Sequence, residues 1–132
     1  MEKIVGIFGS KVIYCPEIIH RTTLKLKEKI DFGTKKFVVM AEGDFGDITT
    51  QAMKYLLLDN KDVVFEMLGD SETNFRYLLE VCDEILYYVV PNIKCDASVR
   101  VEEVEKTGKP ATNLFVEYDN ETYILGTNRR YT

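Results

Sequence analysis

The sequence predicts one three-layer α/β domain: a mainly parallel sheet covered by helices on both faces, with an antiparallel hairpin at its C-terminal edge. Short apolar runs alternate with amphipathic stretches, an order typical of parallel strands joined by helices. Runs such as Phe-Val-Val-Met at residues 37–40 are apolar throughout, as expected where a strand is covered on both faces. The length of 132 residues predicts a single domain over residues 1–132.

Four apolar runs predict the parallel strands. They lie at residues 3–8, 37–40, 62–66 and 85–90, and the first runs into a turn at Gly9 and Ser10. The edge hairpin is predicted from strands at residues 113–118 and 122–125. They are joined at Asp119 and Asn120, because Asp and Asn tolerate the positive φ of a tight turn.

Two helices are predicted in the first half of the chain. The first follows Pro16 and ends at Gly33, and its apolar stripe consists of Ile19, Thr23, Leu26 and Ile30. The second covers residues 48–58, and its inward side chains are Ile48, Ala52, Tyr55 and Leu56.

Two more helices are predicted in the second half. Ser71 caps the third helix, whose buried face consists of Phe75, Leu78, Leu79 and Cys82. Asp96 or Ser98 caps the fourth helix, which ends at Gly108 and Pro110 and turns two side chains inward, Val101 and Val104.

Composition limits the classes of function. The chain has 17 Lys and Arg against 22 Asp and Glu, a net charge of −5 that argues against a nucleic-acid partner. Its apolar runs are too short to span a membrane and its N-terminus lacks a signal peptide, so we expect a cytosolic protein with no membrane partner. Cys15, Cys82 and Cys95 form no CxxC or Cys/His cluster, which predicts neither a disulfide framework nor a metal site.

The first candidate site follows the first strand. In open parallel sheets, ligands bind beyond the carboxyl ends of the strands, which selects loops at residues 9–15, 42–47 and 91–96. Gly9 lets the backbone approach a ligand closely, and the Ser10 hydroxyl can hold a phosphate or ribose oxygen. The alternative is that both residues only form a tight turn. Because the sequence has no GxGxxG or Walker motif, no cofactor of either kind is predicted.

The second candidate loop leads into the second helix. Gly43 and Gly46 at a helix start would expose backbone N–H groups to an anion. Asp44 and Asp47 disfavour a bare phosphate and favour a ligand with hydroxyl groups, such as a ribose. The alternative is that Asp47 is an N-cap and that the glycines shape the turn.

Other reactive side chains offer weaker candidates. His20 stands beside no Ser, Cys or Asp in a triad pattern, so we interpret it as structural. Cys15 and Cys95 fall in loops on the ligand side, where we interpret them as buried or idle thiols rather than nucleophiles.

Two short motifs resemble those of the SLOG superfamily, whose members are Rossmann-like proteins that bind nucleotides or nucleosides. The likeness is greatest to its small YspA/YpsA-like group. Gly9, Ser10 and Lys11 match the first motif, with Lys11 where Arg is usual. Gly43, Gly46 and Asp47 match the second, although Gly46 and Asp47 are adjacent where the family usually has one residue between them.

The chain also departs from two related enzyme classes. The PGGxGTxxE signature of lonely-guy phosphoribohydrolases is absent. Nucleoside deoxyribosyltransferases have a nucleophilic Glu eight residues before the position of Gly108, and here that residue is Arg100.

The resemblance implies a domain that binds a small, nucleotide-like molecule. The residues expected to bind it are Gly9, Ser10, Lys11, Gly43, Asp44, Gly46 and Asp47. One alternative is a nucleoside-processing enzyme, an N-glycosidase or deoxyribosyltransferase that uses Asp47 or Glu102. The other is a structural or interaction protein whose ligand site has decayed. A homodimer is also expected, because small domains of this kind commonly pair and the hairpin at residues 113–125 offers an open edge.

Overall fold

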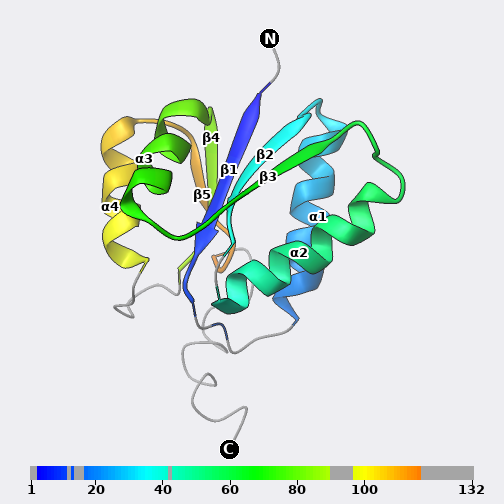
Figure 1. The fold of residues 1–132 in the computed structure, drawn as a ribbon, viewed down its shortest axis with the longest axis horizontal. Coiled ribbons are helices and arrows are strands. Elements are labelled where there is room, and N and C mark those ends of the chain that lie inside the picture. Colours follow the sequence, from blue (N-terminus) through cyan, green and yellow to red (C-terminus); the bar gives the residue numbers. More distant parts are fainter. Residues whose placement is uncertain (1–2, 12, 14–16, 42, 90–96, 117–132) are drawn as a thin grey trace, which may run out of the picture.

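The computed structural model describes residues 3–11, 13, 17–41, 43–89 and 97–116. They form a five-stranded sheet between two layers of helices (Figure 1). The strands lie in the order β3-β2-β1-β4-β5, and every neighbouring pair is parallel. Their bounds are β1 (Ile4–Gly9), β2 (Lys36–Met40), β3 (Val64–Leu68), β4 (Glu84–Tyr88) and β5 (Ala111–Asn113). The predicted three-layer α/β architecture is confirmed, and the strand order is Rossmann-like.

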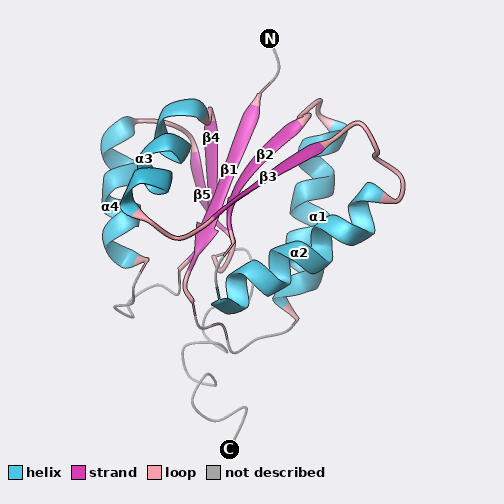
Figure 2. Ribbon diagram, viewed as in Figure 1, coloured by secondary structure: helices cyan, strands magenta, loops and turns pink. Residues whose placement is uncertain are grey.

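Two helices cover each face of the sheet, as Figure 2 shows. The four helices are α1 (Ile18–Asp31), α2 (Gly43–Leu57), α3 (Glu72–Val81) and α4 (Ser98–Thr107). The chain steps outward from β1 through β2 to β3 and then crosses back to β4 on the other side of β1. Helices α1 and α2 therefore pack on one face, and α3 and α4 on the other. The strand order reverses between β1 and β4, which is where such sheets bind ligands.

Alternate side chains of β1 serve the two cores. Val5 and Ile7 pack with residues of α1 and α2, whereas Phe8 packs with residues of α3. The Phe8 ring lies edge-on to Phe75, with ring centroids 5.5 Å apart. Both faces of the central strand are thus buried, as its unbroken apolar sequence predicts.

Helix α1 is rotated relative to its predicted stripe. Thr22 and Ile18 are buried where Thr23 and Ile19 were expected, and the latter two are half-buried. The buried Thr22 hydroxyl is satisfied because it donates to the Ile18 carbonyl at 2.7 Å and hydrogen-bonds the Tyr88 hydroxyl. A polar side chain with two such partners fits a core position that hydrophobicity alone assigns elsewhere.

Gly33 ends α1 as predicted. Its φ is +106°, and its N–H donates to the Ile30 carbonyl at 3.0 Å. The N–H of Thr34 donates to the Lys29 carbonyl at 2.9 Å, which completes a Schellman motif.

Helix α2 begins five residues earlier than predicted. The prediction of a loop immediately before Ile48 is wrong, because the helix already begins at Gly43. Its first turn is held by Asp44, whose N–H donates to the Lys11 carbonyl at 2.7 Å and whose carboxylate accepts from the Ile13 N–H at 2.8 Å. Tyr55 was expected inside but is 67% exposed.

The predicted antiparallel hairpin is not supported. Strand β5 starts at Ala111, pairs parallel to β4 and ends at Asn113, and residues 114–116 form a turn. The Asn113 amide explains the end of the strand: it donates to the Val89 carbonyl at 2.8 Å and accepts from the Phe115 N–H at 3.0 Å. The second predicted strand, at residues 122–125, lies outside the described residues.

The remaining strands and caps are close to the predicted ones. Strand β3 begins two residues later than predicted, and β4 lies one to two residues earlier. Ser71 caps α3 by accepting from the Asn74 N–H at 3.1 Å, and Gly108 ends α4 with a φ of +73°. Ser98 is not the predicted cap but the first residue of α4, after the N-cap Ala97.

Within the described ranges, no helix has the length and apolar character needed to cross a bilayer.

Candidate functional site

A small cavity lies at the carboxyl end of β1, on the face covered by α3 and α4. Its volume is about 90 Å³. Strands β1 and β2, the loop after β3 and the start of α4 all contribute to its wall. The lining residues are Phe8, Gly9, Lys11, Met40, Asp70, Ala97 and Arg100. The cavity therefore occupies the edge of the sheet where ligands of parallel α/β proteins bind.

Three charged side chains meet in this wall. Asp70 Oδ1 lies 2.6 Å from Arg100 Nη1, and Asp70 Oδ2 lies 3.4 Å from Lys11 Nζ. Burial opposes ionisation of Asp70, but Arg100 and Lys11 outweigh it and hold the pKa of the carboxyl below its ordinary value. We name these three residues the charged cluster. Two positive groups and one negative group give it a net charge of +1.

Arg100 is also held by an aromatic ring. Its guanidinium carbon lies 5.0 Å from the centroid of the Phe75 ring, within the range of a cation–π contact. Only about a fifth of the Arg100 side chain is exposed. The guanidinium is thus held in position by contacts within the protein.

The end of β1 is held in place by hydrogen bonds of Ser10 and by close packing at Gly9. The Ser10 N–H donates to the Tyr88 carbonyl at 3.0 Å, and its hydroxyl donates to the same oxygen at 3.3 Å. A Cβ added at Gly9 would lie 2.8 Å from Tyr88 Cβ and 2.9 Å from Phe45 Cδ1. Gly9 lines the cavity, but its lack of a side chain is required by packing beneath it.

The second candidate loop lies against the first, as the sequence predicts. Asp44 bonds the backbone of Lys11 and Ile13, so the segments after β1 and β2 are in direct contact. The space beside the glycines is nevertheless filled. A Cβ at Gly43 would lie 2.5 Å from the Lys11 carbonyl oxygen, and one at Gly46 would lie 2.8 Å from the Ala41 carbonyl carbon.

The predicted site residues thus divide into two groups. Gly9 and Lys11 line the cavity, whereas Gly43, Asp44 and Gly46 support it from the first turn of α2 without lining it. Asp47 is exposed one residue further along α2. Ser10 is buried, and its N–H and hydroxyl groups both donate to the Tyr88 carbonyl.

Asp70 and Arg100 also line the cavity but are not among the residues predicted from the sequence. Asp70 follows β3 directly, so the rule that selected the other loops would have selected it as well. In the sequence, Arg100 stands out only because it replaces the nucleophilic Glu of the deoxyribosyltransferases. Its pairing with Asp70 joins segments 30 positions apart, which no local pattern reveals.

Asp47 and Glu102, the carboxylates that the enzyme alternative would use, do not line the cavity, and neither does the neighbouring Glu103. Glu103 accepts from Arg76 at 2.6 Å, and Glu102 and Asp47 are exposed outside the cavity lining. Asp96, Cys15 and Cys95 fall outside the described residues. Cys82 is buried, and burial raises its pKa to about 12, which makes it a poor nucleophile. In the part of the chain that the structure describes, no three His, Cys, Asp or Glu side chains form a group that could hold a metal ion.

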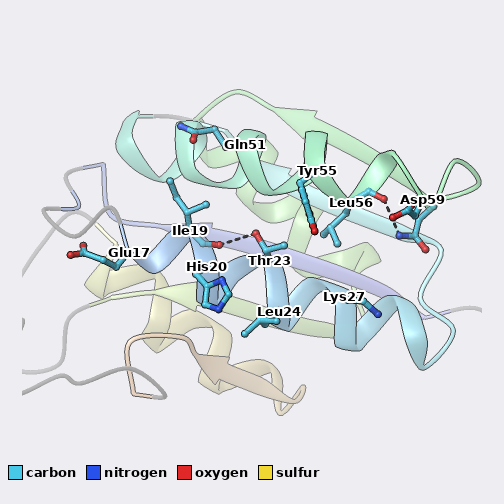
Figure 3. Close-up of a pocket in the computed structure, with 11 residues that line it drawn as sticks. Glu17, Ile19, His20, Thr23, Leu24, Lys27, Gln51, Tyr55, Leu56 and Asp59 are labelled. Atoms are coloured by element: carbon cyan, nitrogen blue, oxygen red, sulfur yellow. Dashed lines mark hydrogen bonds between the residues drawn. The ribbon is translucent and has the colours of Figure 1, made fainter.

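A second, larger hollow lies on the opposite side of the sheet. It is a groove between α1 and α2 with a volume of about 970 Å³, and Figure 3 shows the side chains along it. Ile19 and Leu24 of α1 and Tyr55 and Leu56 of α2 give it a largely apolar wall. His20, which the sequence left without a catalytic partner, is exposed on α1 beside this groove.

No protein-family model and no curated protein sequence matches this chain.

Proposed function

We propose that this protein binds a small phosphorylated molecule, of the nucleotide kind, at the carboxyl edge of its sheet between β1 and β4. The observation that carries the proposal is the convergence of Lys11 and Arg100 on one cavity at that edge. The proposal agrees in position and ligand class with the SLOG-like resemblance of the sequence.

Local charge supports an anionic ligand. The whole chain carries a charge of −5, but the charged cluster carries +1. The cavity also adjoins the start of α4, where the N-cap is the apolar Ala97 and the first turn carries Arg100. The positive end of a helix dipole adds to the attraction for an anion.

The size of the cavity limits what enters it. At about 30 Å³ per water molecule, 90 Å³ corresponds to about three waters. That space suits one phosphate or carboxylate group and not a whole nucleotide. In this proposal the phosphate occupies the cavity and the sugar and base lie outside it, across the ends of β1 and β4.

Binding without glycosidic cleavage is the better-supported function. An N-glycosidase or a deoxyribosyltransferase needs a carboxylate directed at the sugar. The carboxylate in the cavity wall is Asp70, and its two cations stabilise the ionised form and occupy its oxygens. Asp70 is therefore a weak base and a hindered nucleophile, and we assign it to positioning Arg100 and Lys11.

The test is a thermal-shift titration with inorganic phosphate, ribose 5-phosphate, adenosine and AMP. We expect the phosphorylated compounds to raise the melting temperature and adenosine to have a much smaller effect. Arg100→Gln should weaken AMP binding by about tenfold or more, equivalent to about 1.4 kcal/mol, because one charge-assisted contact is lost.

The matched control is Arg76→Gln. Arg76 also belongs to an ion pair, with Glu103 and Glu72, but it does not line the cavity. Its substitution should leave the AMP affinity unchanged. Equal affinities in wild type and Arg100→Gln, or no shift with any compound, would contradict the proposal. Release of free adenine from AMP, followed by chromatography, would instead favour the enzyme reading.

A further inference from the structure

The groove between α1 and α2 has the form of a contact surface. Leu24 is 47% exposed and Tyr55 is 67% exposed, and Ile19 and Leu56 also line the groove (Figure 3). Leu58, one turn beyond Tyr55 on the chain, is 69% exposed. Exposed apolar side chains that gather beside one hollow mark an interaction site more often than scattered ones do.

Helix α1 carries a second stripe of side chains besides the one that it buries in the core. The stripe consists of Glu17, His20, Leu24, Lys27 and Asp31, and its spacings are three, four, three and four residues. Its first four members line the groove. This spacing places the five side chains on one face of the helix.

Two side chains of opposite charge lie at opposite ends of the groove. Figure 3 shows Glu17 at one end of the groove and Lys27 at the other. The two residues are ten positions apart, about 15 Å along a helix, so they do not pair with each other within one chain. If two copies of α1 packed antiparallel about a two-fold axis, Glu17 of each copy would face Lys27 of the other. A parallel arrangement would instead place like charges together.

We propose that this groove is the interface of a homodimer, in which α1 packs antiparallel against α1 of a second copy. Two Glu17–Lys27 pairs then flank the centre of the interface, where Leu24 of one copy lies opposite His20 of the other. Tyr55 of each copy closes over the apolar groove of its neighbour. Within one chain, Lys27 Nζ lies 2.9 Å from Asp31 Oδ2. Because this ion pair is exposed, Lys27 can exchange Asp31 for Glu17 of the second copy at little cost in free energy.

Charge complementarity favours a second copy over other occupants. The chain's own sequence supplies both members of each pair, in the order that a two-fold axis requires. A small apolar molecule would cover Ile19 and Leu56 but would bring no charged group to Glu17 or Lys27. This interface differs from the one predicted from the sequence, which relied on the unsupported edge hairpin.

The test is sedimentation velocity of the full chain over a wide range of concentrations. The wild type is expected to approach twice its 15.2 kDa mass as concentration rises. Leu24→Glu and Tyr55→Glu should each leave a folded monomer. The matched control is Val99→Glu, because Val99 is equally exposed at 66% but lies on α4, on the other side of the sheet.

A charge swap tests the antiparallel arrangement. Glu17→Lys and Lys27→Glu should each weaken dimerisation by about tenfold, because both pairs change from attraction to repulsion. The double variant should recover the wild-type affinity. Circular dichroism should show that all variants stay folded.

Three results would overturn the proposal. They are a wild type that stays monomeric at every concentration, a dimer that survives both Leu24→Glu and Tyr55→Glu, and a double variant no better than the single ones. A monomeric wild type that binds the apolar dye anilinonaphthalene sulfonate, with binding lost in Leu24→Glu, would assign the groove to a small apolar molecule instead.

Discussion

The cavity at the end of β1 and the groove between α1 and α2 differ in size, in charge and in their position in the fold. The cavity at the end of β1 has about 90 Å³ and brings together Lys11, Asp70 and Arg100. The groove between α1 and α2 has about 970 Å³, and apolar side chains such as Leu24 and Tyr55 line it. Volume alone would favour the groove as the ligand site. Charge and position in the fold favour the cavity, because fixed cations and the reversal of strand order mark where α/β sheets bind anions.

The two regions also differ in how deeply they are built into the fold. The charged cluster draws its members from three segments far apart in the sequence, and ion pairs hold them. The groove is formed by the outer faces of two neighbouring helices, where side chains change at little cost to folding. Substitutions should therefore affect stability at the cavity and association at the groove.

The largest loss of stability is expected for Gly9→Val. The added Cβ would lie under 3 Å from both Tyr88 and Phe45, in the packed core beneath the cavity. We expect the free energy of unfolding to fall by about 3 kcal/mol. Urea denaturation gives the value, and Tyr55→Val, at the exposed groove, is the comparison with an expected change within about 0.5 kcal/mol. A Gly9→Val protein as stable as wild type would contradict the packing described at this position.

Asp70→Asn should have opposite effects on stability and on phosphate binding. The substitution removes the carboxylate that pairs with Arg100 and Lys11, so stability should fall by about 1.5–3 kcal/mol. The same change raises the charge of the cluster from +1 to +2, so phosphate affinity should rise. Calorimetric titration with AMP measures the second effect. Weaker AMP binding by the folded variant would mean that the loss of Asp70 as the residue that positions Arg100 and Lys11 outweighs the gain in positive charge.

The stability supplied by Asp70 should depend on pH in one direction. Its folded-state pKa is lowered below the ordinary value of 3.8. Ionised Asp70 thus stabilises the fold fully above that ordinary value, and the contribution is lost as pH falls through the lowered pKa. Urea melts of wild type and Asp70→Asn should differ by a constant amount from neutral pH down to about pH 5 and converge below about pH 4. A difference that shrinks already between pH 7 and pH 6 would point to another titrating group.

The smallest effect on folding is expected for Leu24→Glu. The side chain is half-exposed on α1, so the free energy of unfolding of the monomer should change by no more than about 0.5 kcal/mol. AMP affinity should remain that of wild type, since the groove and the cavity lie on opposite sides of the sheet. Loss of AMP binding in this variant would show that the groove and the cavity are not independent.

Local patterns predicted most of the fold. The alternation of apolar runs and amphipathic stretches gave the parallel sheet and its four helices, and glycines such as Gly33 and Gly108 marked helix ends. What failed depended on single side chains with distant partners. The Asn113 amide, bonded to the Val89 carbonyl, ends β5 where the sequence continued a strand. Asp44, bonded to the backbone of Lys11 and Ile13, draws a glycine-rich loop into the first turn of α2.

The candidate site was predicted in position more than in composition. The rule for parallel sheets selected the edge at which the cavity lies, and Gly9 and Lys11 line that cavity. Gly46 was expected to admit a ligand, but the backbone of Ala41 fills that space, so a larger residue there should harm folding first. The pairing of Asp70 with Arg100 was not predicted, because an ion pair between a loop and a distant helix leaves no periodic signal in the sequence.

An amide chemical-shift titration of the ¹⁵N-labelled protein with AMP tests the central claim most directly. The proposed function predicts saturable shifts at Gly9, Lys11, Asp70 and Arg100, with Leu24 and Tyr55 unmoved. The same titration of Arg100→Gln should reach saturation at concentrations about tenfold higher or more. Shifts confined to the groove, or none at the four cavity residues, would contradict the account.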